Sequence, residues 1–307
     1  MKKIIYFIAL LSIAFNYSCS DGLPDEQFEK LVLLTKNGWI DKDINISESG
    51  IVEIPLATSI SGTSSNMEDV EVSLGFDPDT LFNYNFGKYR KDSLLYYKNV
   101  PDSAVYFENT VVNIKKNNDS GVTKLIIDLN KITDKYKDYV IPVQILNTSR
   151  YVLANNIYTK ALYHLQLKND YSGTYTGSTI IYKTKGTAEI NDEEQKVTIS
   201  NKVLYALTDS TCYFYAGQID RSSTDRDKYI VNVTFHKNGT ITMNSAITAL
   251  NFVLENITMS VVKKDNTSDN RYENVVTTLD MTYKFTDLTS NRLRSDGLVS
   301  MSQQVLK

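Results

Sequence analysis

The sequence predicts an all-β protein with two domains. Short runs rich in Val, Ile, Thr and Tyr recur at the spacing of about 8–12 residues that is typical of β-sandwiches and β-barrels, and helical periodicity is scarce. A chain of 307 residues suggests two domains. Hydrophobic and aromatic fractions of 42% and 11% exclude a disordered chain. A formal net charge of −3, without a long basic run, argues against a nucleic-acid partner.

Residues 1–18 have the composition of an export signal. Lys2 and Lys3 are followed by an apolar run over residues 4–15, which only Ser12 interrupts. This run is long enough for a signal peptide but too short to span a bilayer. Its removal takes away two basic residues and no acidic one, so the net charge changes from −3 to −5.

A cysteine follows this apolar run. Ser18 precedes Cys19, and the next residues are polar and acidic, although Asn16 departs from the aliphatic residue that is usual three positions before the cysteine. The segment resembles a bacterial lipoprotein cleavage site, which implies an acylated Cys19 and a tether over residues 19–27. Several acyl chains would anchor the protein at the outer membrane by themselves. An ordinary secretory signal with an incidental cysteine is the alternative.

Residues 28–150 are predicted to form an immunoglobulin-like sandwich. Strict alternation places Tyr139 and Ile141 on one face of a strand. Asp77 and Pro78 are typical of the start of a short capped helix. The predicted strands cover residues 30–35, 50–56, 70–76, 103–107, 110–115, 122–129 and 139–146.

Several short motifs follow one another in this region: Val70–Leu74, Asp77–Asp79, Leu81–Asn85, Val100–Pro101, Tyr106 and Tyr139–Ile145. Their order resembles the N-terminal immunoglobulin-like domain, of unassigned function, of many Bacteroidetes surface lipoproteins. The resemblance covers residues 28–147. It implies that the next domain is either a glycosidase or a β-rich module that binds glycans at a glycan-utilisation locus.

Residues 151–307 are predicted to form a second antiparallel unit, either a lipocalin-like β-barrel or a sandwich. Lys237-Asn238-Gly239 separates strands over residues 229–236 and 240–247, and an Asn-Gly pair is a strong hairpin signal. A second hairpin is predicted from residues 252–263 and 274–285.

The end of the chain is similar to the C-terminal modules of the same lipoproteins. This similarity lies in Tyr283–Leu288 and Gly297–Met301, and the last strand is predicted over residues 297–306. A further strand, over residues 157–167, follows the bridge between the domains. The sequence alone assigns it to neither domain.

Residues for metal or triad chemistry are sparse. His164 and His236 are far apart, no His or Cys pair has the spacing of metal ligands, and no Gly-x-Ser-x-Gly motif is present. We therefore expect surface or cap histidines, no metal and no cofactor. Asp220, Asp225 and Asp227 lack the order of a calcium loop and indicate a solvated loop.

Glycoside hydrolysis needs two carboxylates facing each other across a cleft. The candidates are Asp69 with Glu71 and Glu189 with the acids at 192–194. Their positions on an alternating strand and in a turn are better explained as solvent-facing charges. We therefore expect a binding protein rather than an enzyme.

The second cysteine of the chain is Cys212. Once Cys19 carries lipid, Cys212 has no partner for a disulfide within the chain. It lies in an apolar run typical of a strand, which predicts a buried, unreactive thiol.

The supply of aromatic residues favours a carbohydrate ligand. Tyr and Trp rings stack on the apolar faces of sugars, and the chain has 21 Tyr, 11 Phe and one Trp. Trp39 is expected in a loop, and alternation sends Tyr213 and Tyr215 to one face of their strand. Ordinary core tyrosines are the alternative, because strands favour Tyr. The candidate ligand-binding residues are Trp39, Tyr171, Tyr175, Tyr182, Tyr213 and Tyr215.

Four tripeptides resemble the O-glycosylation sequence of Bacteroidetes. Each consists of an aspartate, a hydroxyl residue and a third residue, a pattern that also arises by chance. The candidate acceptors are Thr80, Ser93, Ser103 and Ser210.

These observations predict a lipid-anchored outer-membrane protein at the cell surface, contacting the membrane through the anchor only. We expect it to bind carbohydrate noncovalently as an accessory protein of glycan utilisation, with outer-membrane proteins as candidate partners. A structural or adhesion protein for protein partners is the first alternative. A glycoside hydrolase with an unrecognised carboxylate pair is the second.

Overall fold

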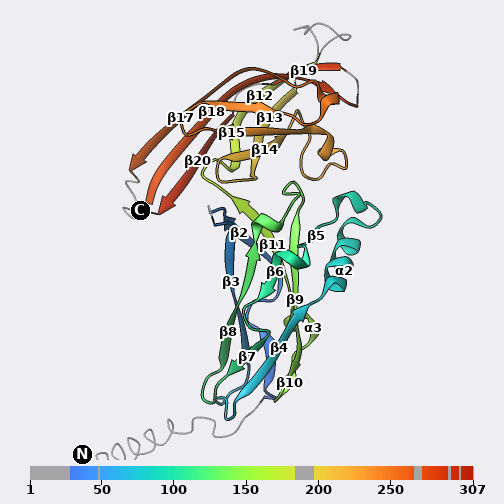
Figure 1. Cartoon of the computed structure of the whole chain (residues 1–307), viewed down its shortest axis with the longest axis vertical. Coiled ribbons are helices and arrows are strands. Elements are labelled where there is room, and N and C mark those ends of the chain that lie inside the picture. Colours follow the sequence, from blue (N-terminus) through green and yellow to red (C-terminus); the bar gives the residue numbers. More distant parts are fainter. Residues whose placement is uncertain are drawn as a thin grey trace, which may run out of the picture.

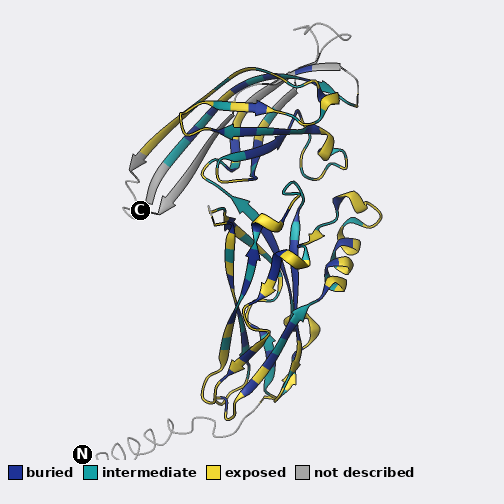
Figure 2. Ribbon diagram, viewed as in Figure 1, coloured by how far each residue is buried: buried dark blue, intermediate teal, exposed yellow. Residues whose placement is uncertain are grey.

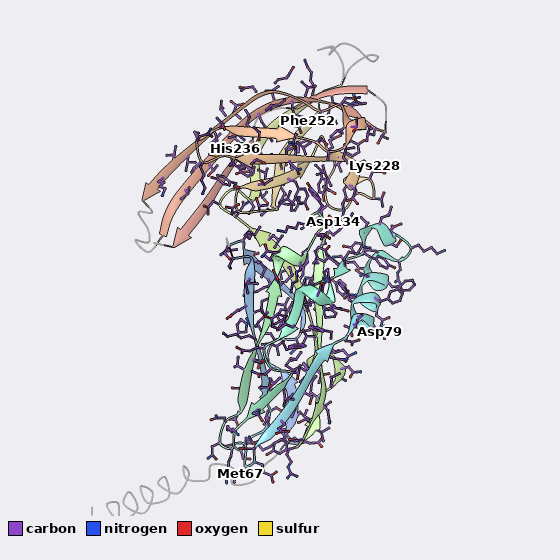
Figure 3. The ribbon with its side chains drawn as sticks, in the orientation of Figure 1. Met67, Asp79, Asp134, Lys228, His236 and Phe252 are labelled. Atoms are coloured by element: carbon purple, nitrogen blue, oxygen red, sulfur yellow. The ribbon has the colours of Figure 1, made fainter. Side chains whose placement is uncertain are left out.

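The computed structural model confirms an all-β chain (Figure 1). It describes residues 28–47, 49–183, 197–265, 272–289, 292–296 and 299–306. The signal segment, Cys19, residues 19–27 and the acids at 189–194 lie outside the described residues. Figure 1 shows an elongated first domain beneath a strongly curved second domain, and Figure 3 places Asp134 where the two domains meet.

The first domain is a sandwich of two sheets. One sheet has the order β10-β1-β3-β8-β6, and the other has the order β2-β11-β9-β4-β7 with β5 beside β9. Its strands are β1 (Leu31–Leu34), β2 (Gly38–Asn45), β3 (Ile51–Ile60), β4 (Val70–Phe76), β5 (Lys98–Asn99), β6 (Val105–Phe107), β7 (Val111–Ile114), β8 (Ser120–Asp128), β9 (Tyr139–Thr148), β10 (Val152–Leu153) and β11 (Lys160–Lys168).

All seven strands predicted for the first domain are present, and all but β4 have shifted ends. Alternation along them builds one core between the sheets, with Val32, Ile54 and Ile127 almost completely buried. Figure 2 shows this buried layer along the length of the domain. Short 3-10 turns also occur, η2 (Ser93–Leu95), η3 (Asp102–Ala104) and η4 (Leu129–Lys131).

Strand β11 moves the expected domain boundary. It pairs in parallel with β2 and antiparallel with β9, so residues 151–168 pack with the first domain. The boundary expected after residue 150 therefore lies near Asn169. The short helix α3 (Asn156–Thr159) precedes β11.

Helix α2 (Pro78–Tyr89) confirms the predicted capped helix at a greater length. Asp77 accepts hydrogen bonds from the Thr80 amide at 3.4 Å and the Thr80 hydroxyl at 2.5 Å. Lys160 of β11 adds an ion pair to Asp77 at 2.6 Å. The helix buries Leu81 and Asn85 against the domain and leaves its other face in solvent (Figure 2).

The second domain is built on one curled, nine-stranded sheet. Its main path is β16-β15-β14-β13-β12-β19-β18-β17, and β20 pairs with both β12 and β18. Among the described residues no ladder joins β16 to β17 at the ends of this path. The strands are β12 (Gly173–Lys183), β13 (Val197–Ala206), β14 (Thr211–Tyr215), β15 (Ile230–Phe235), β16 (Ile241–Asn244), β17 (Val253–Asp265), β18 (Tyr272–Asp287), β19 (Arg292–Asp296) and β20 (Val299–Leu306), with 3-10 turns η5 (Arg226–Tyr229) and η6 (Thr248–Leu250).

Both predicted hairpins of this domain are confirmed. β15 pairs with β16 across Asn238-Gly239, where Gly239 has a φ of +82°, and β17 pairs with β18. The register of β12 against β13 shifts between Thr176 and Thr179, beside Gly177. A glycine there allows the local bend.

Asn169 ties the end of β11 to the second domain. Its Oδ1 accepts hydrogen bonds from the amides of Tyr171 and Ser172 and from the Cys212 thiol, at 3.0, 2.8 and 3.2 Å. Cys212 is fully buried, as predicted, and burial raises the pKa of its thiol to about 12.

Candidate functional site

A charged loop joins the two domains. Residues 132–138 connect η4 to β9, and Tyr136 projects from this loop to the second domain. The Tyr136 hydroxyl lies 3.0 Å from Asn232 Oδ1 and 2.9 Å from Asn232 Nδ2 on β15. Its ring meets that of Tyr213 edge-on, at 5.1 Å between centroids. Tyr136 therefore fastens the first domain to the β14–β15 face of the second.

Asp138 of the same loop is buried between two arginines of the second domain. Only 4% of Asp138 is exposed, and its carboxylate lies 2.5 Å from Arg221 and 3.3 Å from Arg226. A buried carboxylate needs such partners, because an unpaired one is strongly destabilising. The loop expected to be solvated, around Asp220 to Asp227, is therefore partly an interface, because it supplies both arginines.

Arg221 is held rigidly at this interface. Its guanidinium carbon lies 4.3 Å from the centroid of the Tyr205 ring. Burial, the largest single influence, would lower the pKa of Arg221, but the Asp138 carboxylate and the neighbouring tyrosines Tyr213, Tyr205 and Tyr215 together outweigh burial and raise it. Arg221 is therefore a fixed cation between the domains.

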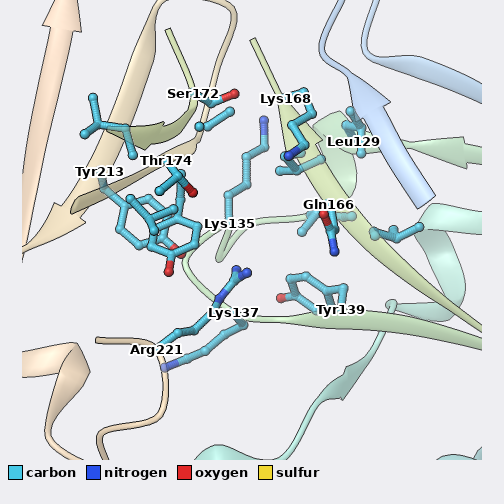
Figure 4. A pocket seen from close by; sticks show the side chains of 18 residues that line it. Leu129, Lys135, Lys137, Tyr139, Gln166, Lys168, Ser172, Thr174, Tyr213 and Arg221 are labelled. Atoms are coloured by element: carbon cyan, nitrogen blue, oxygen red, sulfur yellow. The ribbon is translucent and has the colours of Figure 1, made fainter. Parts of the chain in front are cut away.

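A cavity lies beside Arg221, between the domains. It has a volume of ≈ 250 Å³, somewhat below the range of about 300–1,000 Å³ that is usual for small-ligand sites. Figure 4 shows Arg221, Tyr139 and Lys135 around its open centre, with Tyr213 on the side of the second domain. We call this space the interdomain cavity. Its polar and aromatic lining residues are Lys135, Lys137, Tyr139, Gln166, Lys168, Ser172, Thr174, Tyr205, Tyr213 and Arg221.

The tyrosines of the interdomain cavity are neutral hydrogen-bonding groups at ordinary pH. Burial raises the pKa of Tyr205 to about 12, and it raises the pKa of Tyr213 and Tyr139 as well. Their aromatic faces and hydroxyls suit a ligand that has both apolar and polar surfaces.

Two further cavities adjoin the interdomain cavity. One, of ≈ 140 Å³, shares Val203 and Tyr205 with it and reaches Tyr215. The other, of ≈ 300 Å³, shares Leu129 and Lys135 and reaches Ser47 of the first domain. The ≈ 140 Å³ space is lined by the second domain alone, whereas residues of both domains line the other two.

Trp39 does not lie in a loop or at this junction. It is on β2, half-buried, and its ring stacks on Tyr84 at 4.5 Å and contacts Tyr97 at 4.9 Å. The parallel pairing of β2 with β11, which the sequence did not reveal, places it there.

Lys88 of α2 lies next to the aromatic rings around Trp39. Its ammonium lies 5.0–5.8 Å from the ring centroids of Trp39, Tyr84, Tyr89 and Tyr97, and it donates a hydrogen bond to the Tyr97 hydroxyl at 2.9 Å. We call these five residues the Trp39 cluster. Its rings contact one another and the Lys88 ammonium.

Two of the candidate tyrosines of β12 and the preceding turn are structural. Tyr175 is fully buried and donates a hydrogen bond to the Tyr171 carbonyl at 2.9 Å. Tyr171 stacks on Phe235 at 3.9 Å. Tyr182 belongs to β12, and its side chain is outside the described residues.

Tyr213 and Tyr215 lie on one side of β14, and Phe214 contacts Tyr283 instead. Tyr213 lines the interdomain cavity, whereas Tyr215 lines its ≈ 140 Å³ neighbour. Of the candidate residues whose side chains the structure describes, only Tyr213 lines the interdomain cavity. Tyr213 and Tyr215 are both less than 5% exposed, so most of each ring packs against protein.

The histidines have structural partners. His164 is buried, not at the surface as expected, and its Nδ1 lies 2.7 Å from Asp41 Oδ1. The His164 hydrogen bond, more than burial or Trp39, sets the pKa of Asp41 below its usual value. His236 is exposed and lies 2.9 Å from Thr242 Oγ1. Among the described residues no group of three or more His, Cys, Asp or Glu side chains could hold a metal ion.

The candidate glycosylation residues differ in exposure. Ser93 in η2 and Ser103 in η3 are exposed. Thr80 is hydrogen-bonded in the cap of α2, and the Ser210 hydroxyl bonds Asp209 at 3.1 Å.

Of the residues that make this site, Tyr213 alone was a candidate from the sequence. Tyr139 was predicted on a strand face, and Lys135, Asp138, Tyr205 and Arg221 were not among the candidates. One signal was available: the run Asp134-Lys135-Tyr136-Lys137-Asp138 interrupts two apolar strands with charges and an aromatic residue. Only the fold brings it against the arginines some 85 positions later in the chain.

Two family models match the chain. Residues 24–150 match a domain of unknown function, DUF4973, and residues 159–300 match a model described as a "-like, C-terminal" domain. The comparison with curated proteins finds no match. No helix among the described residues is long and apolar enough to cross a bilayer.

Solved structures from Bacteroides share the two-domain fold. A Bacteroides ovatus protein of unknown function is 22% identical with a TM-score of 0.78, covering 89% of this chain and 94% of its own. A multidomain protein including DUF1735, from the same species, is 22% identical with a TM-score of 0.76 over 89% and 94%. An auxiliary nutrient binding protein from Bacteroides thetaiotaomicron is 21% identical with a TM-score of 0.73 over 87% and 92%. The first part of the chain is thus similar to a domain of unknown function, and the chain shares its two-domain fold with solved structures from Bacteroides.

Proposed function

We propose that this protein binds carbohydrate noncovalently, as a lipid-anchored accessory protein of glycan utilisation on the cell surface, and has no catalytic step. The observation that carries this proposal is the interdomain cavity. Its tyrosine rings and hydroxyls, together with Gln166 and Thr174, match the mixed apolar and polar faces of a sugar ring. The volume of ≈ 250 Å³ suits one small unit, and the adjoining spaces give a longer ligand room to continue.

The comparison with an auxiliary nutrient binding protein is consistent with this proposal. At 21% identity that likeness concerns the fold. The anchor is inferred from the resemblance of residues 1–19 to a lipoprotein signal. Mass spectrometry of the membrane-extracted N-terminus tests the anchor, and release of a Cys19→Ser variant from the membrane fraction is the expected result.

Blocking the cavity tests the binding proposal. Thr174 is exposed at the mouth of the interdomain cavity, so Thr174→Trp fills the space without removing a core contact. Thr258→Trp, on the exposed face of β17, is the matched control. Affinity gels and glycan arrays with the mature protein should detect a polysaccharide that Thr174→Trp no longer binds and Thr258→Trp still binds. Failure to bind any plant, host or microbial polysaccharide contradicts the proposal.

A protein partner is the second candidate function, and the outer face of α2 favours it. Phe82 and Phe86 are 59% and 49% exposed there and stack on each other at 6.4 Å. Exposed apolar groups of this kind are common at protein interfaces. Co-purification with a stoichiometric protein partner would favour this function if the double variant Phe82→Ser, Phe86→Ser no longer binds that partner. The parent protein should then show no affinity for any glycan.

A further inference from the structure

The charged side chains that line the interdomain cavity are all basic. They are Lys135, Lys137, Lys168 and Arg221, and no aspartate or glutamate in the described part of the chain lines the cavity. This bias is local, because the whole chain carries a net charge of −3. A small space with low-dielectric walls and charges of one sign concentrates ions of the opposite sign.

Some of this positive charge is balanced by carboxylates at the rim. Lys137 is paired with Asp227 and turns away from the open centre in Figure 4. Lys168 is 3.7 Å from Asp43, an ion pair at the outer limit of contact. Asp138 serves Arg221 and Arg226 together, so one carboxylate faces two guanidinium groups. The charged side chains of the cavity wall itself are nonetheless all basic.

Two cations remain available to a ligand. Lys135 has no ion-pair partner among the described residues, and it lines both the interdomain cavity and the ≈ 300 Å³ neighbour. Arg221 is fixed by Asp138 and Tyr205, and its buried Nε has no hydrogen-bond partner among the described atoms. A buried donor without a partner is unfavourable unless a ligand or water supplies the acceptor.

We propose that the interdomain cavity selects an acidic saccharide, whose carboxylate or sulfate group lies between Lys135 and Arg221. This inference rests on the proposed function and names its ligand class. Arg221 offers planar, preorganised donors to such an oxyanion, and Lys135 offers a mobile charge from the opposite domain. A neutral sugar offers neither group a negative charge.

Matched polysaccharides test the charge preference. The mature protein is titrated calorimetrically with polygalacturonic acid and with the carboxyl-reduced form of the same polymer, and with dextran sulfate and dextran. The acidic member of at least one pair should bind about tenfold or more tightly than its neutral counterpart, and its affinity should fall as salt is added. The pair that discriminates identifies carboxylate or sulfate as the group.

Lys135→Gln locates the effect. This change removes the charge and leaves the Arg221–Asp138 interface intact, so about a tenfold loss is expected for the acidic polymer only. Lys131→Gln is the matched control, since Lys131 is four residues away and exposed. Equal binding of both members of each pair, or acidic binding that Lys135→Gln leaves unchanged, overturns the inference but not carbohydrate binding. An absence of any polysaccharide ligand overturns both.

Discussion

The Trp39 cluster and the residues around Arg221 are built from the same kinds of side chain. Each gathers several aromatic rings about one cation, Lys88 in the first domain and Arg221 between the domains. The Lys88 ammonium lies near four aromatic rings of its own domain, so cation–π contacts within that domain already stabilise it. Arg221 contacts the Tyr205 ring on one side and borders an open cavity on another.

This difference teaches that aromatic content alone does not identify a binding site. An aromatic ring that stacks on a sugar needs a face that the protein leaves uncovered. One face of Trp39 is stacked on Tyr84, at an interplanar angle of 13°. The space beside Arg221 exists because two domains meet imperfectly there. We therefore expect perturbation of the Trp39 cluster to change stability alone, and perturbation of the junction to change stability and binding together.

The largest expected effect is at Asp138. Asp138→Asn removes the buried charge that Arg226, which is buried, and Arg221, which is partly exposed, share. Breaking a buried ion pair costs about 3–5 kcal/mol of unfolding free energy. Urea denaturation, monitored by circular dichroism, should show this loss. We expect one unfolding transition for both domains of the parent and separate transitions for the two domains of the variant. The control is Asp69→Asn, at an exposed pair with Lys115, which should leave the midpoint unchanged. Unchanged stability of Asp138→Asn would mean that the junction does not depend on this pair.

Trp39→Ala is expected to have the next largest effect. Loss of a fully buried tryptophan costs about 3–5 kcal/mol, and a half-buried one about 2 kcal/mol. Circular dichroism is the appropriate readout, because Trp39 is the one tryptophan and its removal abolishes the usual fluorescence signal. Tyr106→Ala, at an aromatic residue that is 52% exposed, is the control. Any loss of ligand affinity in Trp39→Ala would break the contrast between the two clusters.

Local patterns in the sequence predicted most elements of this fold. Strand β4 begins and ends at the predicted residues, Asp77 caps its helix, and Asn238-Gly239 forms its hairpin, because each depends on neighbouring residues. Strand β2 was not predicted, and β11 was predicted as a strand but assigned to neither domain. These two pair in parallel across more than 110 residues, so no local turn signals them.

The site was predicted far less well than the fold, for the same reason. Tyr213 was a candidate, but its cavity is made by Lys135 and Tyr139 from one domain and Tyr205 and Arg221 from the other. Alternation along a strand indicates which side chains share a face. It does not indicate which faces leave a space when two domains dock.

A smaller effect is expected from Tyr136→Phe. The change removes the hydroxyl that lies 2.9–3.0 Å from the Asn232 amide, and a single hydrogen bond contributes about 1 kcal/mol. A double-mutant cycle with Asn232→Ala should give a coupling of similar size, measured from urea midpoints. Tyr158→Phe, at an exposed hydroxyl in α3, is the control. Additive effects would show that Tyr136 holds the domains by its ring alone.

Ionisation of the buried tyrosines has the smallest expected effect, because it does not change the free energy of unfolding below about pH 10. Burial raises the pKa of both Tyr97 and Tyr205 to about 12, although Lys88 and Arg221 respectively oppose this. Between about pH 10 and 12 the unfolded chain has lost protons that the native one retains, so stability falls as pH rises through this window. Ultraviolet absorbance of tyrosinate should show a fraction of tyrosines that ionises only on unfolding.

The variant Lys88→Met sharpens the comparison. Without the Lys88 hydrogen bond the pKa of Tyr97 rises further, while the pKa of Tyr205 is unaffected because Arg221 remains. A shift at both tyrosines would mean that the two clusters are electrostatically connected, and their separation into a closed cluster and an open junction would then fail.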